Sequence, residues 1–354
     1  MDVDWFSPEL DHRFTVKMVD PIDHDSELGI LDVYASGSVR YDSSTDTVAS
    51  AVINAVDWTQ WIENTWLRIE HTITGTSFKE TIGTFLVWDE GISYTLDSKE
   101  ASPQLYSSLM ALSYDYLYNH ILVGKGASLK EAMQRVCSSA ARRYDFASDV
   151  EDYRFVSPML FDAGDSRLDT LISMGRIGNI DVRPSEKGYI SFVRHVPAVS
   201  KTPVIAIDCN SPRTVVREGS VRPISDKRQV PNRSVAVFKG DGESDTVTAY
   251  ADLDSSDPMS PHLRGYVVAE IHELDSDEEW GTTSLHAQTR AREFLVTDSK
   301  TTEGYAFDCA YLPIRNDDVI SFCPPGESKY QNLKVVSVEL DLGNWSMSVE
   351  AHFV

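Results

Sequence analysis

The sequence of 354 residues lacks any apolar run long enough to cross a membrane. Its longest apolar stretches, such as 203–207, fall far short of the ~20 residues that a membrane-spanning helix needs. The N-terminal segment 1–5 has neither a basic start nor an apolar core, so it does not read as a secretory signal. We therefore expect a soluble chain that is made in a cytoplasm and makes no stable membrane insertion.

Cysteine is scarce. The four cysteines lie far apart and form no C-x-x-C pair; they are Cys137, Cys209, Cys309 and Cys323. An intracellular origin argues against a disulfide framework. The sequence therefore predicts buried, reduced thiols.

Catalytic and nucleotide-binding motifs are missing as well. There is no G-x-G-x-x-G or G-x-S-x-G, and the stretch around Gly124 and Gly126 is not a P-loop, because Asn119 stands where the first glycine belongs. The pair His272-Glu273 is not followed by the second histidine of a zinc-protease helix. The nine histidines are scattered, with no pair at metal-ligand spacing. We predict no catalytic residue, no cofactor-binding residue and no metal ligand.

Two acidic stretches have a composition that suits calcium. They hold Asp20, Asp23, Asp25 and Glu27, and Asp252, Asp254 and Asp257. Neither has the EF-hand frame, with its glycine at position 6 and glutamate at position 12, so a solvated loop is the preferred interpretation of each. A carboxylate pair for glycoside cleavage stays an open alternative, because the sequence does not give distances between its 55 acidic residues.

Charge is strongly one-sided. The chain carries 55 Asp and Glu against 32 Lys and Arg, a net charge of −23. Holding DNA requires cations that displace the counterions of phosphates, so stable DNA binding is excluded as the main task, whereas passage of DNA is not. Solubility alone explains the same number equally well.

The charge is also uneven along the chain. Residues 1–100 have a net charge of −13, residues 166–234 of +6 and residues 240–280 of −11. A basic belt between two acidic segments predicts complementary surfaces, within the chain or between copies. Chance composition of solvated faces is the alternative.

The first hundred residues read as strands. In 65–73, Leu67, Ile69 and Ile73 alternate with Arg68 and Glu70, and 78–88 and 92–96 continue the pattern. A glycine inside one of these runs, Gly83, predicts a β-bulge. Five of the seven tryptophans fall here, and core packing is the preferred role for most of them, with an interface as the alternative: Trp5, Trp58, Trp61, Trp66 and Trp88.

Helices follow. Ser128 and Glu131 form a capping box, and behind it a core-facing stripe predicts a helix; the stripe is Leu129, Ala132, Met133, Val136 and Ala140. A second helix is predicted from Asp165 or Ser166 to a terminating Gly178, followed by a hairpin over 179–194. The segment 102–118 is ambiguous, although Ser102-Pro103 has the composition of a helix start.

Beyond residue 196 the elements are short until the end of the chain. Short strands are predicted at 204–207, 215–217 and 234–238, then a turn-rich loop at 254–261 and a helix at 284–296. The closing hairpin is the clearest signal. Its first strand alternates Val336, Val338 and Leu340 with polar residues, and its second alternates Met347, Val349 and Ala351.

The order of these features resembles the tail hub proteins of long-tailed bacteriophages, also called baseplate hub or minor tail proteins. The resemblance covers nearly the whole chain and is carried by Gly83–Val87, the helix–hairpin Ser166–Val193, Val230–Val237, the loop Asp257–Pro261, Leu312–Val319 and Leu342–Met347. It implies a mainly β fold with α+β inserts, built from two related β-barrels and a helix–hairpin domain. The chain departs from the family by having no C-terminal lysin, lectin or fibre-binding extension.

On this resemblance the chain divides into four parts. They are an N-terminal β-barrel at 1–101, an α+β domain at 102–195, an extended connector into the second barrel at 196–282, and a helix with closing strands at 283–354.

The resemblance also implies a function without catalysis. Three copies would form a ring at the distal end of the tail of a virion assembled in the host cytoplasm, and the ring would frame the DNA-ejection channel. The implied partners are other copies of the chain, a distal tail or tail tube protein, the C-terminus of the tape measure protein and receptor-binding, fibre or spike proteins, with DNA only in transit. We expect acids of 1–100 or 240–280 to line the channel and the belt 166–234 to meet an acidic neighbour.

Two alternatives come from other classes. One is a tail-associated cell-wall hydrolase, which needs two carboxylates about 5–9.5 Å apart in a cleft. The other is a stand-alone carbohydrate- or protein-binding β module.

Overall fold

The computed structural model describes residues 3–7, 9–32, 35–45, 47–54, 66–89, 91–94, 99–139, 143–225, 230–239, 246–275, 284–299 and 303–354. The chain forms two compact units by its contacts. Unit 1 comprises 1–222, 306–352 and 354, and unit 2 comprises 223–305 and 353. The predicted positions Trp58, Trp61 and Ala140, the end of the 92–96 strand and part of the acidic segment 240–280 lie outside the described residues.

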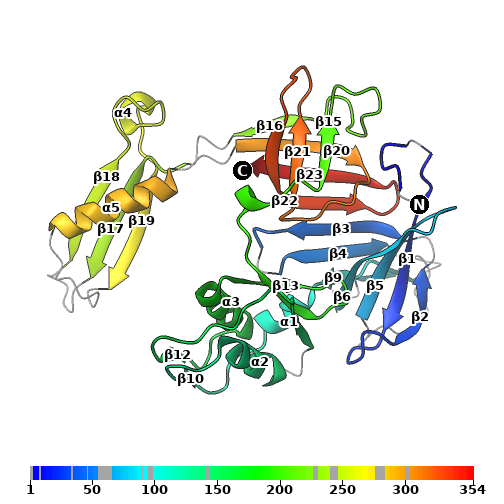
Figure 1. The fold of residues 1–354 in the computed structure, drawn as a ribbon, viewed down its shortest axis with the longest axis horizontal. Helices are drawn as coiled ribbons and strands as arrows, with labels where there is room; N and C mark the ends of the chain where they lie inside the picture. Colours follow the sequence, from blue (N-terminus) through cyan, green and yellow to red (C-terminus); the bar gives the residue numbers. More distant parts are fainter. Residues whose placement is uncertain are drawn as a thin grey trace. The chain divides into compact units, whose positions relative to one another are not determined.

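Unit 1 is built on one large sheet (Figure 1). The strand order is β16-β20-β23-β22-β3-β4-β9-β6-β5-β1-β2, with β21 beside β22 and β15 beside β21. The strands are β1 His12–Val19, β2 Glu27–Asp32, β3 Ser36–Asp42, β4 Ala49–Asn54, β5 Trp66–Ile73, β6 Lys79–Asp89, β9 Gln104–Tyr106, β15 Ile205–Asp208, β16 Arg222–Ser225, β20 Glu303–Ala310, β21 Val319–Cys323, β22 Gln331–Asp341 and β23 Ser346–Phe353. A separate pair is β7 Ile92–Tyr94 with β8 Lys99–Ala101. The chain crosses between the units within β16 and within β20.

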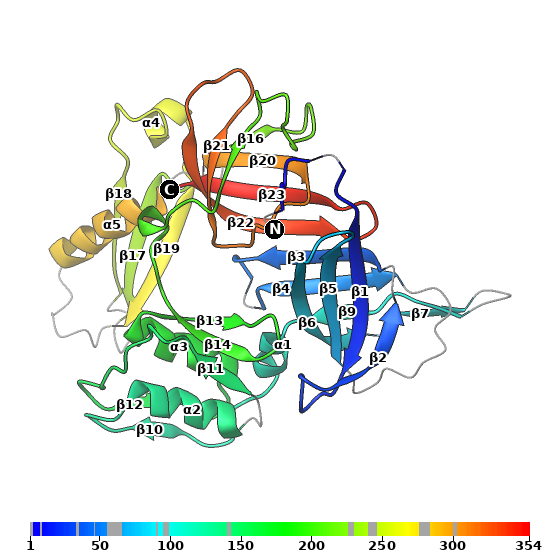
Figure 2. The ribbon, with the colours of Figure 1, turned by 45° about the vertical axis from the view of Figure 1, so that its right-hand side comes forward.

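The sheet changes direction between its two ends. Figure 2 shows that β1, β2 and β5 run at a large angle to β3 and β4, although all of these strands belong to one hydrogen-bonded path. The bulge predicted at Gly83 lies in this region: Ile69 pairs with Gly83 and Glu70 with Thr81, so Ile82 is the extra residue. Bulges bend and twist a strand, which suits this turn in the sheet.

The strand β5 is buried on both faces. Its apolar residues Leu67, Ile69 and Ile73 are buried as predicted, but Arg68 and Glu70 are only 8% and 7% exposed. The apolar and polar residues therefore alternate as predicted, but the polar face is buried as well, because other parts of the chain cover it. The Arg68 Nε atom donates to the Thr84 hydroxyl at 3.1 Å, and its guanidinium also donates to the carbonyl of His24.

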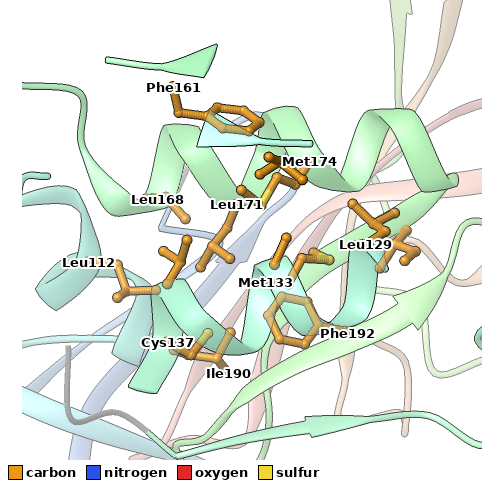
Figure 3. Close-up of a cluster of buried hydrophobic side chains, with 14 of the residues drawn as sticks. Leu112, Leu129, Met133, Cys137, Phe161, Leu168, Leu171, Met174, Ile190 and Phe192 are labelled. Carbon is orange, nitrogen blue, oxygen red and sulfur yellow. The ribbon is translucent and has the colours of Figure 1, made fainter. Parts of the chain in front are cut away.

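The α+β part of unit 1 packs around two helices (Figure 3). Its elements are α1 Ser108–Ser113, β10 Ile121–Val123, α2 Leu129–Ser139, β11 Tyr144–Phe146, β12 Met159–Phe161, α3 Arg167–Gly178, β13 Ile180–Pro184, β14 Ile190–Arg194 and the 3-10 turn η1 Ala198–Ser200. Leu129, Met133, Leu168 and Leu171 lie between α2 and α3, and Phe192 of β14 closes the cluster. The predicted helices and the hairpin β13–β14 are therefore confirmed.

Helix ends follow local chemistry. The Ser128 hydroxyl accepts from the Glu131 amide at 3.1 Å, and the Ser166 hydroxyl accepts from the Asp169 amide at 3.0 Å. The helix ends at Gly178 as predicted, but the residue that takes the left-handed capping conformation is Asn179, with φ 54°. Asparagine tolerates this conformation, so it ends the helix in place of glycine.

The ambiguous segment 102–118 contains a strand and a helix. Pro103 precedes β9, and the helix α1 begins after Ser107, whose hydroxyl accepts from the Leu109 amide at 3.4 Å. The composition of Ser102-Pro103 therefore marked the wrong start.

Unit 2 is a three-stranded sheet covered on one face by a helix. The strands β18 Val247–Asp252, β17 Arg233–Lys239 and β19 Ala269–Asp275 lie in that order, α4 is Pro261–Arg264, and α5 is Ser284–Asp298. The small core between sheet and helix consists of Ala236, Phe238, Ala251, Ala287, Ala291 and Leu295. The buried Asn232 amide donates to the carbonyls of Met259 and Tyr266, both at 3.1 Å, and so fixes the predicted turn-rich loop.

The mainly β fold class with α+β inserts is confirmed. Within the part of the chain that the structure describes, the large sheet is an open path with β16 and β2 at its ends, and no barrel closes. The contact units group α5 with unit 2, whereas the sequence division placed this helix with the closing strands. The four-part domain division stays a prediction.

Candidate functional site

The N-terminal and C-terminal strands meet along one seam. β3 pairs antiparallel with β22, from Asp42 opposite Ser337 to Ser38 opposite Asp341. Val39 and Leu340 are partners in this register, and both are buried. The seam makes the two halves of the large sheet one hydrogen-bonded surface.

A buried polar network lies beside this sheet; we call it the His–Glu network. Its members are His12, His71, Glu80, Tyr311 and Arg315. The His12 Nδ1 atom is 2.9 Å from the His71 Nε2 atom, and the His71 Nδ1 atom is 3.3 Å from Glu80 Oε1. The hydroxyl of Tyr311 donates to Glu80, and Arg315 Nη2 lies 3.4 Å from the same carboxylate oxygen. The network therefore ties β1, β5 and β6 to the segment that follows β20.

The protonation states in this network follow from their surroundings. Burial acts to raise the pKa of Glu80, but the hydrogen bond from His71 and the charge of Arg315 outweigh it, so the pKa is lowered and Glu80 is ionised. Burial, with the neighbouring His71, lowers the pKa of His12 to about 4. An ionised Glu80 requires a donor at His71 Nδ1, so His71 Nε2 accepts from His12 Nδ1, and His12 Nε2 keeps a free lone pair.

An aromatic cavity of about 470 Å³ lies next to the His–Glu network and shares His12 and Tyr311 with it. Its lining includes the aromatic residues Trp5, His12, Tyr311 and Trp345 and the polar residues Ser7, Arg217, Asp308, Asn344, Ser346 and Ser348. Clefts of this size with an aromatic lining and a few polar groups are typical of small-ligand sites. Sequence reasoning did not identify this cavity, because its lining comes from four separate segments of the chain.

Neither a family model nor a curated protein matches this sequence. Solved structures do. A 43 kDa tail protein of prophage MuSo2 from Shewanella oneidensis aligns with 97% of this chain and 98% of its own, with a TM-score of 0.62 and 13% identity. A tail protein from Neisseria meningitidis MC58 aligns over 96% of both chains, with a TM-score of 0.62 and 9% identity.

This chain has the fold of a phage tail protein. The same tail-protein fold aligns with a chain of the Francisella PdpA–VgrG complex, over 98% of this chain and 59% of that one, with a TM-score of 0.54 and 10% identity. The predicted resemblance is confirmed at the level of the fold. At 9–13% identity the likeness shows the fold alone, so the role of each residue is argued from the geometry of this chain.

Three residues of the basic belt 166–234 form ion pairs with acidic residues of the same chain. The Lys187 ammonium lies 3.0 Å from Asp25, Arg213 pairs with Asp4, and Arg233 pairs with Asp252 at 2.6 Å. The belt 166–234 therefore complements both acidic segments within one copy. This was one of the two arrangements that the charge pattern predicted.

The first acidic stretch is used for loop closure and ion pairs. The Asp20 carboxylate accepts from the amides of Ile22 and Asp23. The other three carboxylates have cationic partners: Asp23 has Arg143, Asp25 has Lys187 and Glu27 has Lys17.

The second acidic stretch, 252–257, is used in the same way. Asp252 pairs with Arg233, Asp254 accepts from Ser256, and Asp257 accepts from the Met259 amide. Across the residues with described positions, no three His, Cys, Asp or Glu side chains gather as a metal site.

The other residues named in the sequence analysis contribute to turns, contacts between elements or the core. Gly126 lies in a turn whose amide donates to the Phe155 carbonyl, and His272 Nε2 lies 2.9 Å from Asp298 Oδ2, which links β19 to α5. The four cysteines are free thiols, and burial raises the pKa of Cys137 and of Cys309 to about 12, so both stay protonated. Among the helices that the structure describes, none is long and apolar enough to cross a membrane.

The histidine pair is what the sequence reading missed. His12 and His71 are 59 residues apart, but Phe14 is the register partner of His71, so the two histidines are diagonal neighbours on adjacent strands. The only available signal was that His71 falls on the same face of the predicted strand 65–73 as Leu67, Ile69 and Ile73. No strand was predicted at His12, and strand pairing is not readable from a single strand.

Proposed function

We propose that this chain is a structural hub protein of a bacteriophage tail. Three copies form a ring at the distal end of the tail, and the ring joins the tail tube or distal tail protein to the receptor-binding apparatus. The observation that carries the proposal is the full-length likeness of fold to two phage tail proteins, which extends over 96–97% of this chain. The role is structural rather than enzymatic.

The arrangement of the large sheet supports a role in which the protein bears mechanical load. The β3–β22 seam joins the two halves of unit 1 through a continuous ladder of backbone hydrogen bonds, and the His–Glu network adds side-chain bonds between the same halves. Both features resist separation of the two halves under force. A structural ring that transmits contraction or attachment needs this property.

The net charge supports a passage for DNA. Three times −23 gives −69 for a ring, and an acidic wall repels phosphates, so that a duplex passes without binding. The further partners in this proposal are the C-terminus of the tape measure protein and the fibre, spike or receptor-binding proteins. The virion tail is the proposed location, with assembly in the host cytoplasm.

Electron microscopy of virions tests this proposal directly. An affinity tag at the C-terminus of the chain, labelled with gold-conjugated antibody, is expected to mark the distal tail end. Label along the tail shaft, on the head or on no particle would contradict the proposal. Native mass spectrometry of the purified chain gives the second measurement. Because like-charged copies repel, trimers are expected to increase as the salt concentration rises from about 10 mM to 150 mM.

The hydrolase alternative has its own measurement. Purified bacterial cell wall incubated with the full chain is expected to release no reducing sugar. Release at a rate that depends on protein concentration would replace the structural assignment with an enzymatic one.

A further inference from the structure

The aromatic residues that line the cavity contact one another. Trp5 and Tyr311 have ring centroids 5.8 Å apart, Tyr311 and His12 5.4 Å apart, and His12 and Trp345 5.7 Å apart. These rings therefore form one connected group beside the cavity, in which Tyr311 and His12 are buried and the two indoles are partly exposed. Indole rings provide large, rigid apolar faces at low conformational cost.

One of these indoles is held in place by an unfavourable backbone. Trp345 has φ 59°, a left-handed conformation that a bulky residue rarely adopts. Backbone bonds impose it: the Trp345 amide donates to the Asp341 carbonyl at 3.0 Å, and the Trp345 carbonyl accepts from the Tyr311 amide at 2.9 Å. Strain of this kind gathers at ligand sites, where the surrounding structure fixes a side chain for a purpose.

The cavity also has unused hydrogen-bonding groups. Across the described part of the chain, the Arg217 side chain makes no hydrogen bond or ion pair, and neither indole N–H, of Trp5 or of Trp345, has an acceptor. The Asp308 carboxylate uses one oxygen, Oδ1, to accept from Ser348 at 2.8 Å. The cavity thus offers three donor groups and acceptors on Asp308 and on the free His12 nitrogen.

We propose that the aromatic cavity binds a pyranose ring of a glycan. The C–H face of the sugar packs on an indole face, while its hydroxyls, which both donate and accept, satisfy Arg217 and Asp308. A simple anion would meet the Asp308 carboxylate, and a purely apolar ligand would leave both Arg217 and Asp308 without partners at a cost in binding. A polyol with one apolar face matches the whole set.

The proposal goes beyond the structural role and does not depend on it. All the residues that it uses belong to unit 1 of a single chain, so the site needs no second copy. A hub with this site would contact glycan itself, in addition to carrying separate receptor-binding proteins.

Binding of simple sugars to the purified full chain tests the proposal. The probes are the methyl pyranosides of glucose, galactose, mannose and N-acetylglucosamine, followed by saturation-transfer NMR and isothermal titration calorimetry. We expect at least one to bind with a dissociation constant of about 1 mM, the affinity usual for a ligand of this size. Arg217→Ala is expected to weaken that binding roughly tenfold, because it removes a charged hydrogen-bond donor. Trp345→Ala is expected to abolish it.

Matched controls separate the cavity from the rest of the surface. Arg194→Ala removes an exposed arginine outside the cavity, and Trp88→Ala removes a half-exposed tryptophan outside it; both are expected to bind like the unmodified chain. Because Trp345→Ala changes a strained turn, the fold of this variant is checked by circular dichroism. If Trp345→Ala does not fold, Arg217→Ala gives the decisive result.

Three outcomes would overturn the glycan site. No saturable binding of any pyranoside at about 50 mM is one, since a millimolar site would then be filled. Equal binding by Arg217→Ala and the unmodified chain is another. The third is an Arg217-dependent signal from something other than a sugar. Binding of inorganic phosphate alone would assign the cavity to an anion, and a change in trimer formation alone on Arg217→Ala would assign it to a neighbouring copy. None of these outcomes alters the gold-label position on the virion.

Discussion

At the scale of single residues, the interior of unit 1 is sensitive to acid. His12 is 8% exposed and His71 is fully buried, and the pair is joined to an ionised Glu80. A second proton on His12 would place a positive charge in a buried site beside His71, and burial disfavours that charge. Asp11 favours that proton electrostatically, but burial and His71 act against it and prevail.

The first prediction follows from the lowered pKa of His12, about 4 in the folded chain against 6.5 when unfolded. As the pH falls below 6.5, the unfolded chain takes up a proton at His12 and the folded chain does not. The free energy of unfolding therefore decreases by about 3 kcal/mol between pH 6.5 and 4 from this group, and levels off below pH 4. Urea unfolding followed by tryptophan fluorescence at a series of pH values measures this slope.

Two variants assign that slope to His12. His12→Asn keeps a donor toward His71 but does not titrate, so its unfolding free energy is expected to be lower at pH 7.5 and to depend less on pH. His120→Asn removes an exposed imidazole and is expected to keep the original slope. An unchanged slope in His12→Asn would show that another group carries the acid sensitivity.

Residues that act on their immediate neighbours were predictable. The caps Ser128 and Ser166 bond to amides three positions along the chain, so their chemistry is contained in the local sequence. His12, Glu80 and Tyr311 come from three distant segments and needed the strand order before they became neighbours. The aromatic cavity was unreadable for the same reason.

At the scale of elements, the contact between α2 and α3 depends on a missing side chain. A Cβ atom at Gly178 would lie 2.2 Å from Leu129 Cδ2, and Ile180 and Tyr153 would also be within 3.2 Å. The second prediction is that Gly178→Ala lowers the free energy of unfolding by about 1–3 kcal/mol, the usual cost of overpacking. Thermal or urea denaturation measures it.

A double-mutant cycle identifies the contact. Leu129→Ala in the same chain removes the clashing methyl group, so the double variant is expected to be more stable than the sum of the single effects allows. Gly124→Ala is the control, because a Cβ there meets nothing within 4 Å, and its effect is expected within about 0.5 kcal/mol. If the effects of Gly178→Ala and Leu129→Ala on the free energy of unfolding were strictly additive, this explanation would be contradicted.

Elements were predictable where one face is buried and the other is wet. The strand β23 and the helix α5 follow their apolar periods closely, with Met347, Val349 and Ala351 buried in one and Ala287, Ala291 and Leu295 in the other. The strand β5 did not, because a polar residue such as Arg68 can be buried when the fold supplies its acceptors. Likewise, the β3–β22 seam joins residues about 300 positions apart, and nothing local in either strand records its partner.

At the scale of the whole molecule, the two contact units differ in the size of their cores. Among the described residues, the apolar core cluster of unit 2 consists of four alanines, one phenylalanine and one leucine, whereas the cluster in the α+β part of unit 1 has eighteen buried residues. Small cores of small side chains give marginal stability. The third prediction is therefore that calorimetry of the full chain shows two thermal transitions, with unit 2 melting at the lower temperature.

One substitution in each unit assigns the two transitions. Phe238→Ala removes the largest side chain of the unit 2 core and is expected to lower the first transition by roughly 10–20 °C or to abolish it. Leu340→Ala, at the β3–β22 seam, is expected to lower only the second. If both substitutions instead moved one common transition, the chain would unfold as a single cooperative unit, and the boundaries at 222–223 and 305–306 would not separate independent bodies. Two separate transitions would mean that unit 2 can unfold locally while the continuous sheet of unit 1 keeps its hydrogen bonds.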